Sequence, residues 1–298
     1  MRKWWIGAAV VVGVLFFAKV LLLDSSAEAA DNYVIDLDAL HRAANSQGEL
    51  PTSIEVERIA DFAFPRTFVV AGDGFRMHPM ILLSHRVLWP DGTSIVLDTG
   101  LTEHDSEMLP SARFHREGFE RMEKALREAQ QIVFTHEHVD HVGGVAGAPD
   151  FAAVAGKVVI TKEQFDGPRL ERDKFAAGTL EQLKPITYSG LRVLAPGVVL
   201  QKAPGHSTGT QLIYVELAGG VRYLFVGDIA WTEDNIALQR GRPALATLVI
   251  KEDGAAVASQ LRAFAALPKD VHVVVAHDPV AYERDLKAGL FRAGFSVR

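Results

Sequence analysis

The chain has 298 residues, of which 48% are hydrophobic and 23% are charged. These fractions are typical of a soluble globular protein, and they exclude a disordered, collagen-like or many-span membrane protein. The 37 acidic residues outnumber the 31 basic ones and give a formal net charge of −6, so nucleic acid is not an expected partner. Cysteine is absent, and any metal site must therefore use His, Asp or Glu as ligands.

The first thirty residues have the features of a segment that directs export. Arg2 and Lys3 precede Trp4–Leu23, a mostly apolar run of about the length that spans a bilayer as a helix. Ala27-Glu28-Ala29 also fits a signal-peptide cleavage site. We expect residues 1–30 to be a signal anchor or a signal peptide. The remainder would then lie on the periplasmic side of the cell membrane, or be secreted or periplasmic and soluble after cleavage near Ala29.

Residues 31–61 read as a polar tether with weak helical character around Ile54–Ile59, and residues 62–298 read as one domain. Strands and helices alternate through this domain. The Pro90-Asp91-Gly92 and Ala218-Gly219-Gly220 turns predict two hairpins. The strands expected in chain order are Phe68–Ala71, Met80–Trp89, Ser94–Asp98, Gln131–Thr135, Lys157–Ile160, Leu191–Ala195, Thr210–Leu217, Val221–Val226 and Val271–Ala276.

Two segments have the apolar spacing of amphipathic helices, one from Phe119 to Ala129 and one from Val257 to Phe264. Hairpins mixed with strand–helix units predict sheets covered by helices, which is an α/β layered domain.

Polar residues follow four of the expected strands at the point where each strand ends. These residues are Asp98, His136, Asp228 and His277. Because ligands collect at the carboxyl ends of strands in α/β sheets, this placement predicts a single site assembled from distant segments.

The strongest motif is His136-Glu137-His138-Val139-Asp140-His141, a His-x-His-x-Asp-His pattern. In an extended segment residues two apart face the same way, so His136 and His138 can hold one ion together. Asp140 and His141 then point to a neighbouring position. His206, in a turn-rich loop between two expected strands, is a further candidate ligand.

These motifs resemble those of the metallo-β-lactamase superfamily, in the family's order, from about Phe68 to Phe291. The resemblance implies a four-layer αβ/βα sandwich with two divalent metal ions at one edge. It implies His136, His138 and His206 as ligands of the first metal, Asp140, His141 and His277 as ligands of the second, Asp228 as the bridge between both, and Asp98 as a structural residue near the site.

The implied activity is metal-dependent hydrolysis of a small-molecule ester or lactone. A hydroxide shared by the two ions would attack the carbonyl carbon. Asp140 would orient the hydroxide and carry its proton to the leaving oxygen. Ligation by imidazole and carboxylate suits zinc, with iron, manganese and cobalt left open. Diiron oxygen-reducing members usually have a carboxylate at the position of His138, so hydrolysis is favoured over redox chemistry.

The segment Gly227–Ile236 and the later Ala276-His277-Asp278 resemble the N-acyl homoserine lactonase branch. That branch commonly has a tyrosine at the position of Trp231, where its hydroxyl helps hold the substrate carbonyl. An indole N–H can donate a hydrogen bond but cannot act as an acid–base hydroxyl. Trp231 is therefore a candidate substrate-binding residue, and its presence weakens the argument for a lactone.

Other readings stay open at this point. A subclass B3-like β-lactamase would suit an exported zinc enzyme, but those enzymes lack a carboxylate at the position of Asp228. A glyoxalase II-like thioesterase shares the ligands and would use basic residues such as Arg284, Lys287 and Arg292. A hydrolase of aryl sulfates or phosphoesters is a further alternative. An anchored metal-binding scaffold or sensor, attached through residues 4–23 if the run is retained, is the non-enzymatic one. The sequence does not predict the oligomeric state.

Overall fold

The computed structural model describes residues 13, 16, 18–25 and 32–296. Residues 18–22 are helical, and no helix in this described part is long and apolar enough to cross a membrane. Most of the apolar run Trp4–Leu23 lies outside the described residues, so the predicted anchor or signal peptide stays a prediction.

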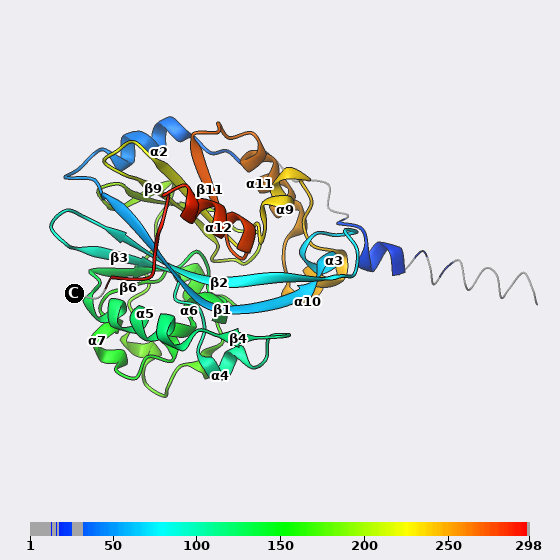
Figure 1. Cartoon of the computed structure of the whole chain (residues 1–298), viewed down its shortest axis with the longest axis horizontal. Coiled ribbons are helices and arrows are strands. Elements are labelled where there is room, and N and C mark those ends of the chain that lie inside the picture. The colour runs from blue at the N-terminus through cyan, green and yellow to red at the C-terminus, as the bar shows by residue number, and fades with distance from the viewer. Residues whose placement is uncertain (1–12, 14–15, 17, 26–31, 297–298) are drawn as a thin grey trace, which may run out of the picture.

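Two β-sheets form the centre of the described chain (Figure 1). The first has the strand order β12-β1-β2-β3-β5-β6, with β4 paired to β1. The second has the order β11-β10-β9-β8-β7. The strands of the first sheet are β1 (Ser53–Pro65), β2 (Met77–Leu88), β3 (Ser94–Leu97), β4 (Arg113–Phe114), β5 (Gln131–Val133), β6 (Val158–Val159) and β12 (Arg292–Ala293). Those of the second are β7 (Leu191–Ala195), β8 (Val198–Lys202), β9 (Gln211–Glu216), β10 (Arg222–Gly227) and β11 (Val271–Val275).

The inner faces of the two sheets pack against each other. Val56 and Leu97 of the first sheet belong to the same buried cluster as Val215 and Phe225 of the second. Alternate residues of a strand point to opposite faces, so each sheet has a second apolar face that needs its own cover.

Helices cover the two outer faces (Figure 1). Helices α5 (Arg116–Glu128), α6 (Val139–Ala146) and α7 (Phe151–Ala155) pack on the first sheet. Helices α2 (Leu37–Ala44) and α11 (Gly254–Ala265) pack on the second. The shorter elements are α3 (Arg66–Val69), α4 (Glu103–Ser106), α8 (Lys162–Phe165), η1 (Arg172–Lys174), η2 (Leu180–Gln182), α9 (Glu233–Ala237), α10 (Ala244–Ile250) and α12 (Pro279–Lys287).

This arrangement confirms the mixed α/β class and most of the expected elements. The amphipathic spacing identified α5 and α11, and both predicted turns join antiparallel neighbours, β2 to β3 and β9 to β10. Strand β8 was not predicted. Only Pro196 and Gly197 separate it from β7, and the sequence analysis predicts one strand here and not a hairpin of two.

The strand predicted at Phe68–Ala71 is wrong. The chain forms helix α3 up to Val69 and leaves it in extended conformation at Val70. Val69 and Val70 are fully buried in the core of the first sheet. A short apolar run satisfies burial equally well as a helical turn or a strand, and periodicity cannot separate the two.

The polar tether at residues 31–61 and the helical character at Ile54–Ile59 are also wrong. Helix α2 packs on the second sheet, and β1 runs through residues 53–65, so the folded domain starts well before residue 62. The acidic residues of β1 interrupt its apolar pattern, so the sequence did not indicate a buried strand. Glu55 is buried against Arg86, whose Nη2 donates at 2.5 Å, and Glu57 is buried against Arg121. A sequence pattern cannot show that a charge is paired in this way.

Candidate metal centre

The His-x-His-x-Asp-His motif lies where the first sheet passes into helix α6. Strand β5 ends at Val133, and the following loop contains His136 and His138. His138 is the N-cap of α6, which puts Asp140 and His141 in the first helical turn. The positive end of the helix dipole favours a carboxylate there. One short loop and one helix start therefore present four candidate ligands to the same space.

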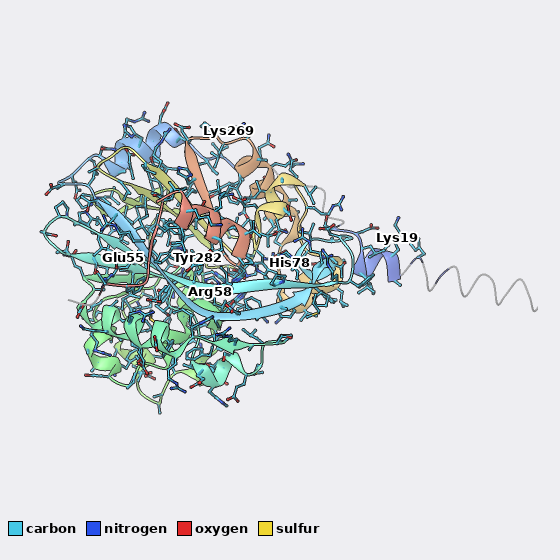
Figure 2. The ribbon with its side chains drawn as sticks, viewed as in Figure 1. Lys19, Glu55, Arg58, His78, Lys269 and Tyr282 are labelled. Carbon is cyan, nitrogen blue, oxygen red and sulfur yellow. The ribbon has the colours of Figure 1, made fainter. Side chains whose placement is uncertain are left out.

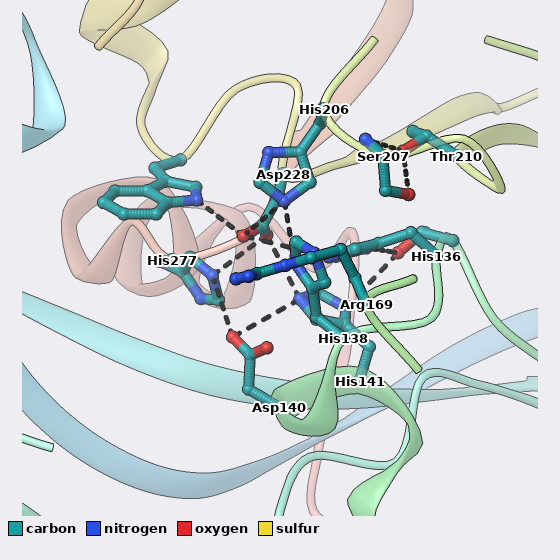
Figure 3. A network of polar contacts seen from close by, with 12 residues as sticks. His136, His138, Asp140, His141, Arg169, His206, Ser207, Thr210, Asp228 and His277 are labelled. Atoms are coloured by element: carbon teal, nitrogen blue, oxygen red, sulfur yellow. Dashed lines mark hydrogen bonds and ion pairs between the residues drawn. The ribbon is translucent and has the colours of Figure 1, made fainter. Parts of the chain in front are cut away.

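The second sheet contributes three candidate ligands from three separate places. His206 lies in the loop between β8 and β9, Asp228 directly follows β10, and His277 follows β11. Gly227 allows Asp228 to approach the motif, because it has a φ of 52° and an added Cβ would lie 2.7 Å from Thr135. Figure 3 shows all of these side chains converging.

The first group consists of His136, His138, His206 and Asp228. His138 Nδ1 lies 3.0 Å from the Nε2 atoms of both His136 and His206. Asp228 Oδ2 lies 3.5 Å from His206 Nε2 and 4.0 Å from His136 Nε2. Four donor atoms thus surround one small space.

The second group consists of Asp140, His141, His277 and the same Asp228. Here Asp228 uses its other oxygen. Oδ1 lies 3.1 Å from His141 Nε2 and 3.0 Å from His277 Nε2. Asp140 Oδ2 lies 3.7 Å from both of these nitrogens. Asp228 therefore stands between two groups of donors and faces each with a different oxygen.

The donor chemistry fits a bound cation. A neutral ring nitrogen carries either one hydrogen or one lone pair, so His138 Nδ1 cannot form a good hydrogen bond with both of its 3.0 Å neighbours at once. A cation bound by the lone pairs of all three nitrogens removes this conflict. Zinc–nitrogen bonds of about 2.0–2.1 Å in a tetrahedron also imply donor separations of about 3.3 Å, close to those seen.

The protonation states point the same way. Burial and the neighbouring His141 lower the pKa of His136 well below its usual value, and burial and His138 do the same to the pKa of His206. Burial would raise the pKa of Asp228, but His277 and His141 hold it well below its usual value. The neutral imidazoles of His136 and His206 beside an ionised carboxylate are the forms that bind a metal. For His141, burial would lower the pKa, but Asp98, Asp140 and Asp228 hold it well above its usual value, so a metal ion in the second group would displace a proton from this ring.

Asp98 orients the motif without joining either group. Its carboxylate accepts hydrogen bonds from the Thr135 backbone N–H at 2.7 Å and hydroxyl at 2.8 Å, and it lies 2.9 Å from His141 Nδ1. Asp98 has a φ of 52°, a left-handed conformation that few residues other than Asn, Asp and Gly adopt readily. It therefore directs His141 Nε2 toward Asp228.

Sequence reasoning missed the residues that orient His206. Glu252 Oε2 lies 2.8 Å from His206 Nδ1, and Arg242 donates to the same oxygen at 2.5 Å. Arg242 also donates to the backbone carbonyl of Asp228. Burial raises the pKa of Glu252 to about 7, against the opposing charge of Arg242. In sequence Glu252 lies between Lys251 and Asp253 and resembles an ordinary solvated loop residue.

Two further contacts hold the second-sheet ligands in place. The His277 Nδ1 faces the backbone carbonyl of Ile81 at 2.9 Å, which leaves Nε2 for Asp228. Within the motif itself, the buried Glu137 accepts a hydrogen bond from the Ser207 hydroxyl at 2.7 Å. This bond ties the motif loop to the loop that carries His206.

Trp231 contacts Asp228 directly. Its indole N–H donates to Asp228 Oδ2 at 2.6 Å, while its ring stacks on Phe64 and lies 4.1 Å from the Arg242 guanidinium carbon. The N–H that the sequence offered to a substrate carbonyl is therefore already used by this carboxylate.

The accessible side of the site is marked by Asp140 and Arg169. The Asp140 side chain is 24% exposed, whereas that of Asp228 is 4% exposed. Arg169 reaches His138 Nε2 at 3.5 Å and extends its guanidinium toward the side where His277 and Asp140 lie (Figure 3). No sequence motif marks Arg169, which lies in an irregular segment after α8.

Two of the basic residues considered for a thioesterase lie on the surface and do not line the metal centre. Arg284 is paired with Glu233 and Asp285. Arg292 is exposed on the edge strand β12. A surface hollow of about 630 Å³ beside His78 contains none of the seven candidate ligands.

Comparisons with solved structures show the same fold in hydrolases. An N-acyl homoserine lactone hydrolase with N-hexanoyl-L-homoserine bound at its catalytic metal centre is 17% identical, with a TM-score of 0.59 over 79% of this chain and 96% of that one. AidC, a dizinc quorum-quenching lactonase, is 17% identical, with a TM-score of 0.54 over 77% and 89%. A probable metal-dependent hydrolase from Staphylococcus aureus is 16% identical, with a TM-score of 0.57 over 76% and 90%.

No curated protein matches the chain. Residues 87–277, well over half of the sequence, match the family described as the metallo-beta-lactamase superfamily. This span begins in β2 and ends at His277, and it includes every candidate ligand. The chain belongs to the metallo-β-lactamase superfamily and is a metal-dependent hydrolase.

Proposed function

We propose that this hydrolase holds two divalent ions, most simply zinc, and cleaves the carbonyl ester bond of a small molecule, with lactones as the first substrate class to test. The observation that carries the proposal is the position of Asp228, whose two oxygens face two separate groups of histidines at 3.0–3.5 Å. A carboxylate in this position can bridge two cations. Two such ions, when bound, supply Lewis acidity and lower the pKa of water to about 7.

In this proposal His136, His138 and His206 hold the first ion with Asp228, and His141, His277 and Asp140 hold the second. Asp140 is also the proton carrier. It is the carboxylate that reaches solvent, and its oxygen is close to the space between His141 and His277. It can therefore take a proton from attacking water and pass it to the leaving oxygen.

Arg169 and Trp231 are the proposed substrate contacts. The Arg169 guanidinium stands at the accessible side of the site and can bind a carbonyl oxygen or a carboxylate as negative charge develops there. Trp231 offers the part of its half-buried ring that Phe64 and Arg242 leave uncovered, because its N–H is engaged by Asp228. In this role it would pack against an apolar part of the substrate.

The choice of lactones rests on the structural neighbours, which include a homoserine lactone hydrolase and a dizinc lactonase. The choice of zinc rests on the dizinc lactonase and on the imidazole and carboxylate donors of this site. We further propose that Trp4–Leu23 attaches the chain to the cell membrane, with the folded domain on the periplasmic side.

The test is a substrate panel of acyl homoserine lactones, aryl esters, thioesters and the β-lactam nitrocefin, assayed with zinc-loaded full-length protein. We expect lactones and esters to be cleaved fastest. Asp140→Ala should lower kcat by about 10²–10⁴-fold and leave the circular dichroism spectrum unchanged. Faster cleavage of nitrocefin than of lactones would replace this proposal by the β-lactamase reading. A well-folded, fully active Asp140→Ala protein would remove the role given to Asp140.

A further inference from the structure

Three segments meet at one end of the molecule. They are the β1–β2 connection with α3, the start of α10, and the first described residues of the chain (Figure 1). The Thr67 hydroxyl donates to the Leu22 carbonyl at 2.7 Å. The first backbone N–H of α10, that of Ala244, donates to the Asp24 carbonyl at 3.2 Å. The chain that follows the apolar run is therefore attached to the folded domain here.

Helix α10 has an unusual composition for its surroundings. Its sequence is Ala-Leu-Ala-Thr-Leu-Val-Ile, without a charged residue, and none of its side chains is buried. Leu248 is 71% exposed and Val249 is 66% exposed. A short helix that shows apolar side chains to water gains stability only when another apolar surface covers it.

The same end carries other exposed apolar side chains. Nine large hydrophobic side chains are exposed in the described part of the chain, and five of them belong to the β1–β2 connection with the start of β2, to the end of α9 and to α10. A sixth, Phe16, lies in the N-terminal apolar run. We call these five the end patch: Phe75, Met77, Leu238, Leu248 and Val249. Single exposed hydrophobic residues are common, but their concentration at one end marks a binding surface.

The route of the chain indicates what covers this patch. The apolar run Trp4–Leu23 leads directly into the contacts of Leu22 and Asp24 with α3 and α10. If the run lies in a bilayer, these contacts place the end patch next to the membrane surface. In Figure 2, Lys19 and His78 lie toward this end and Glu55 lies toward the other.

The charges around the patch favour an anionic surface. Arg76, Arg240 and Lys251 are exposed there, and they form no ion pair within the part of the chain that the structure describes. Arg66 pairs with both Asp73 and Asp234, so this cluster leaves one negative charge over, and Asp24 adds another. The three unpaired cations outnumber these two negative charges. A slightly basic, apolar end on a chain with a net charge of −6 suits a contact with anionic lipid headgroups.

We propose that the end patch inserts into the headgroup region of an anionic bilayer, as a second membrane contact beside the N-terminal run. This inference rests on the proposed membrane attachment. Strand β1 links the patch to the metal centre, because Phe62 contacts His277, Phe64 stacks on Trp231, and the strand ends directly before α3. Insertion of the patch would hold the metal centre at a fixed, short distance from the membrane surface.

The absence of cysteine makes a direct test possible with the full chain. Leu248→Cys and Phe75→Cys each provide one labelling site in the patch. Gln47→Cys is the matched control, since Gln47 is also exposed but precedes β1 at the end of that strand away from α3. Each protein would carry an environment-sensitive fluorophore and be reconstituted into vesicles of phosphatidylcholine and phosphatidylglycerol that contain nitroxide-labelled lipid.

We expect nitroxide quenching of about twofold or more at positions 75 and 248 and little at position 47, because an interfacial apolar helix lies about 5–10 Å into the headgroup region. Equal quenching at all three positions would overturn the inference, and so would failure of the full chain to float with vesicles. Rapid disulfide formation between copies of the Leu248→Cys protein without lipid would assign the patch to a second copy instead. Hydrolysis of a soluble lactone by the same proteins reports separately on the proposed activity.

Discussion

The two halves of the molecule contribute to the metal centre in different ways. The first sheet and α6 supply four candidate ligands from one short stretch, His136 to His141, held by the buried carboxylate of Asp98. The second sheet supplies three ligands from three separate loops. Of these, His206 is held by Glu252, and His277 is held by a carbonyl of the first sheet.

This difference shows that neither half is a metal site alone. The first group needs His206 and Asp228 from the second sheet, and the second group needs Asp228 and His277. Asp228 is the common member, so the packing of one sheet on the other decides whether either group is complete. A compact motif in one half depends on a dispersed set of ligands in the other.

The largest expected effect comes from removing the shared ligand. Asp228→Ala should disrupt both groups at once, and a loss of about 4 kcal/mol of transition-state stabilisation corresponds to a drop of about a thousand-fold in kcat/KM. Metal analysis of the purified protein should show fewer than two equivalents of zinc. Asp166 is an exposed aspartate that pairs with Lys162, and Asp166→Ala is the control, which should keep its activity and two equivalents of zinc. Full metal content in the Asp228→Ala protein would refute the bridging position.

A smaller effect should separate the two halves. Glu252→Gln loosens His206 and should weaken the first ion by about 10–100-fold, while Asp98→Asn loosens His141 and should weaken the second ion by a similar factor. Competition with a chelator, followed as a stepwise zinc titration, measures each affinity. Equal weakening of both ions by each substitution would show that the two halves do not hold separate ions.

The smallest effect concerns the contact between the sheets. His85 is buried between Phe225 and Phe291, and burial lowers its pKa to about 4. The unfolded state, with a pKa near 6.5, binds a proton that the folded state does not, so stability falls as the pH drops from about 6.5 to about 4. Between pH 7 and pH 5 this costs about 2 kcal/mol of unfolding free energy.

Denaturant unfolding of the metal-free protein at pH 7 and pH 5 measures this difference. His85→Leu should lose about 2 kcal/mol less than the wild type over the same interval. His272→Leu, a half-buried histidine on β11, is the control and should behave as the wild type does. An unchanged pH dependence in His85→Leu would mean that His85 does not resist protonation in the folded state.

The motif His136–His141 could be predicted from the sequence because its four candidate ligands are neighbours along the chain and need no tertiary structure to bring them together. The positions of Asp228 and His277 after apolar strands, and of His206 in a loop between two strands, also make them candidates, and their grouping into two sets of ligands rests on the family resemblance. Glu252 and Arg242 could not be identified, because their importance comes only from burial against His206 and Asp228.

The same limit applied to the fold. Strand β1 has an alternating pattern, but Glu55 and Glu57 place acidic side chains at buried positions on the face opposite Val56. Distant partners, among them Arg86 and Arg121, make these carboxylates compatible with burial. Hydrophobic patterning therefore identified the strands with apolar cores and failed where a buried charge was paired across the chain.

The partners of β1 have a consequence for how the protein is made. Glu55 accepts a hydrogen bond from the backbone of Ser296, 241 positions later, and β12 pairs alongside in parallel. During synthesis this edge of the first sheet stays open until almost all of the described sequence has emerged. An incomplete sheet delays compact folding. A nascent chain that completes its fold this late would stay unfolded for most of its synthesis, and an unfolded chain is the form that can pass through a translocation pore.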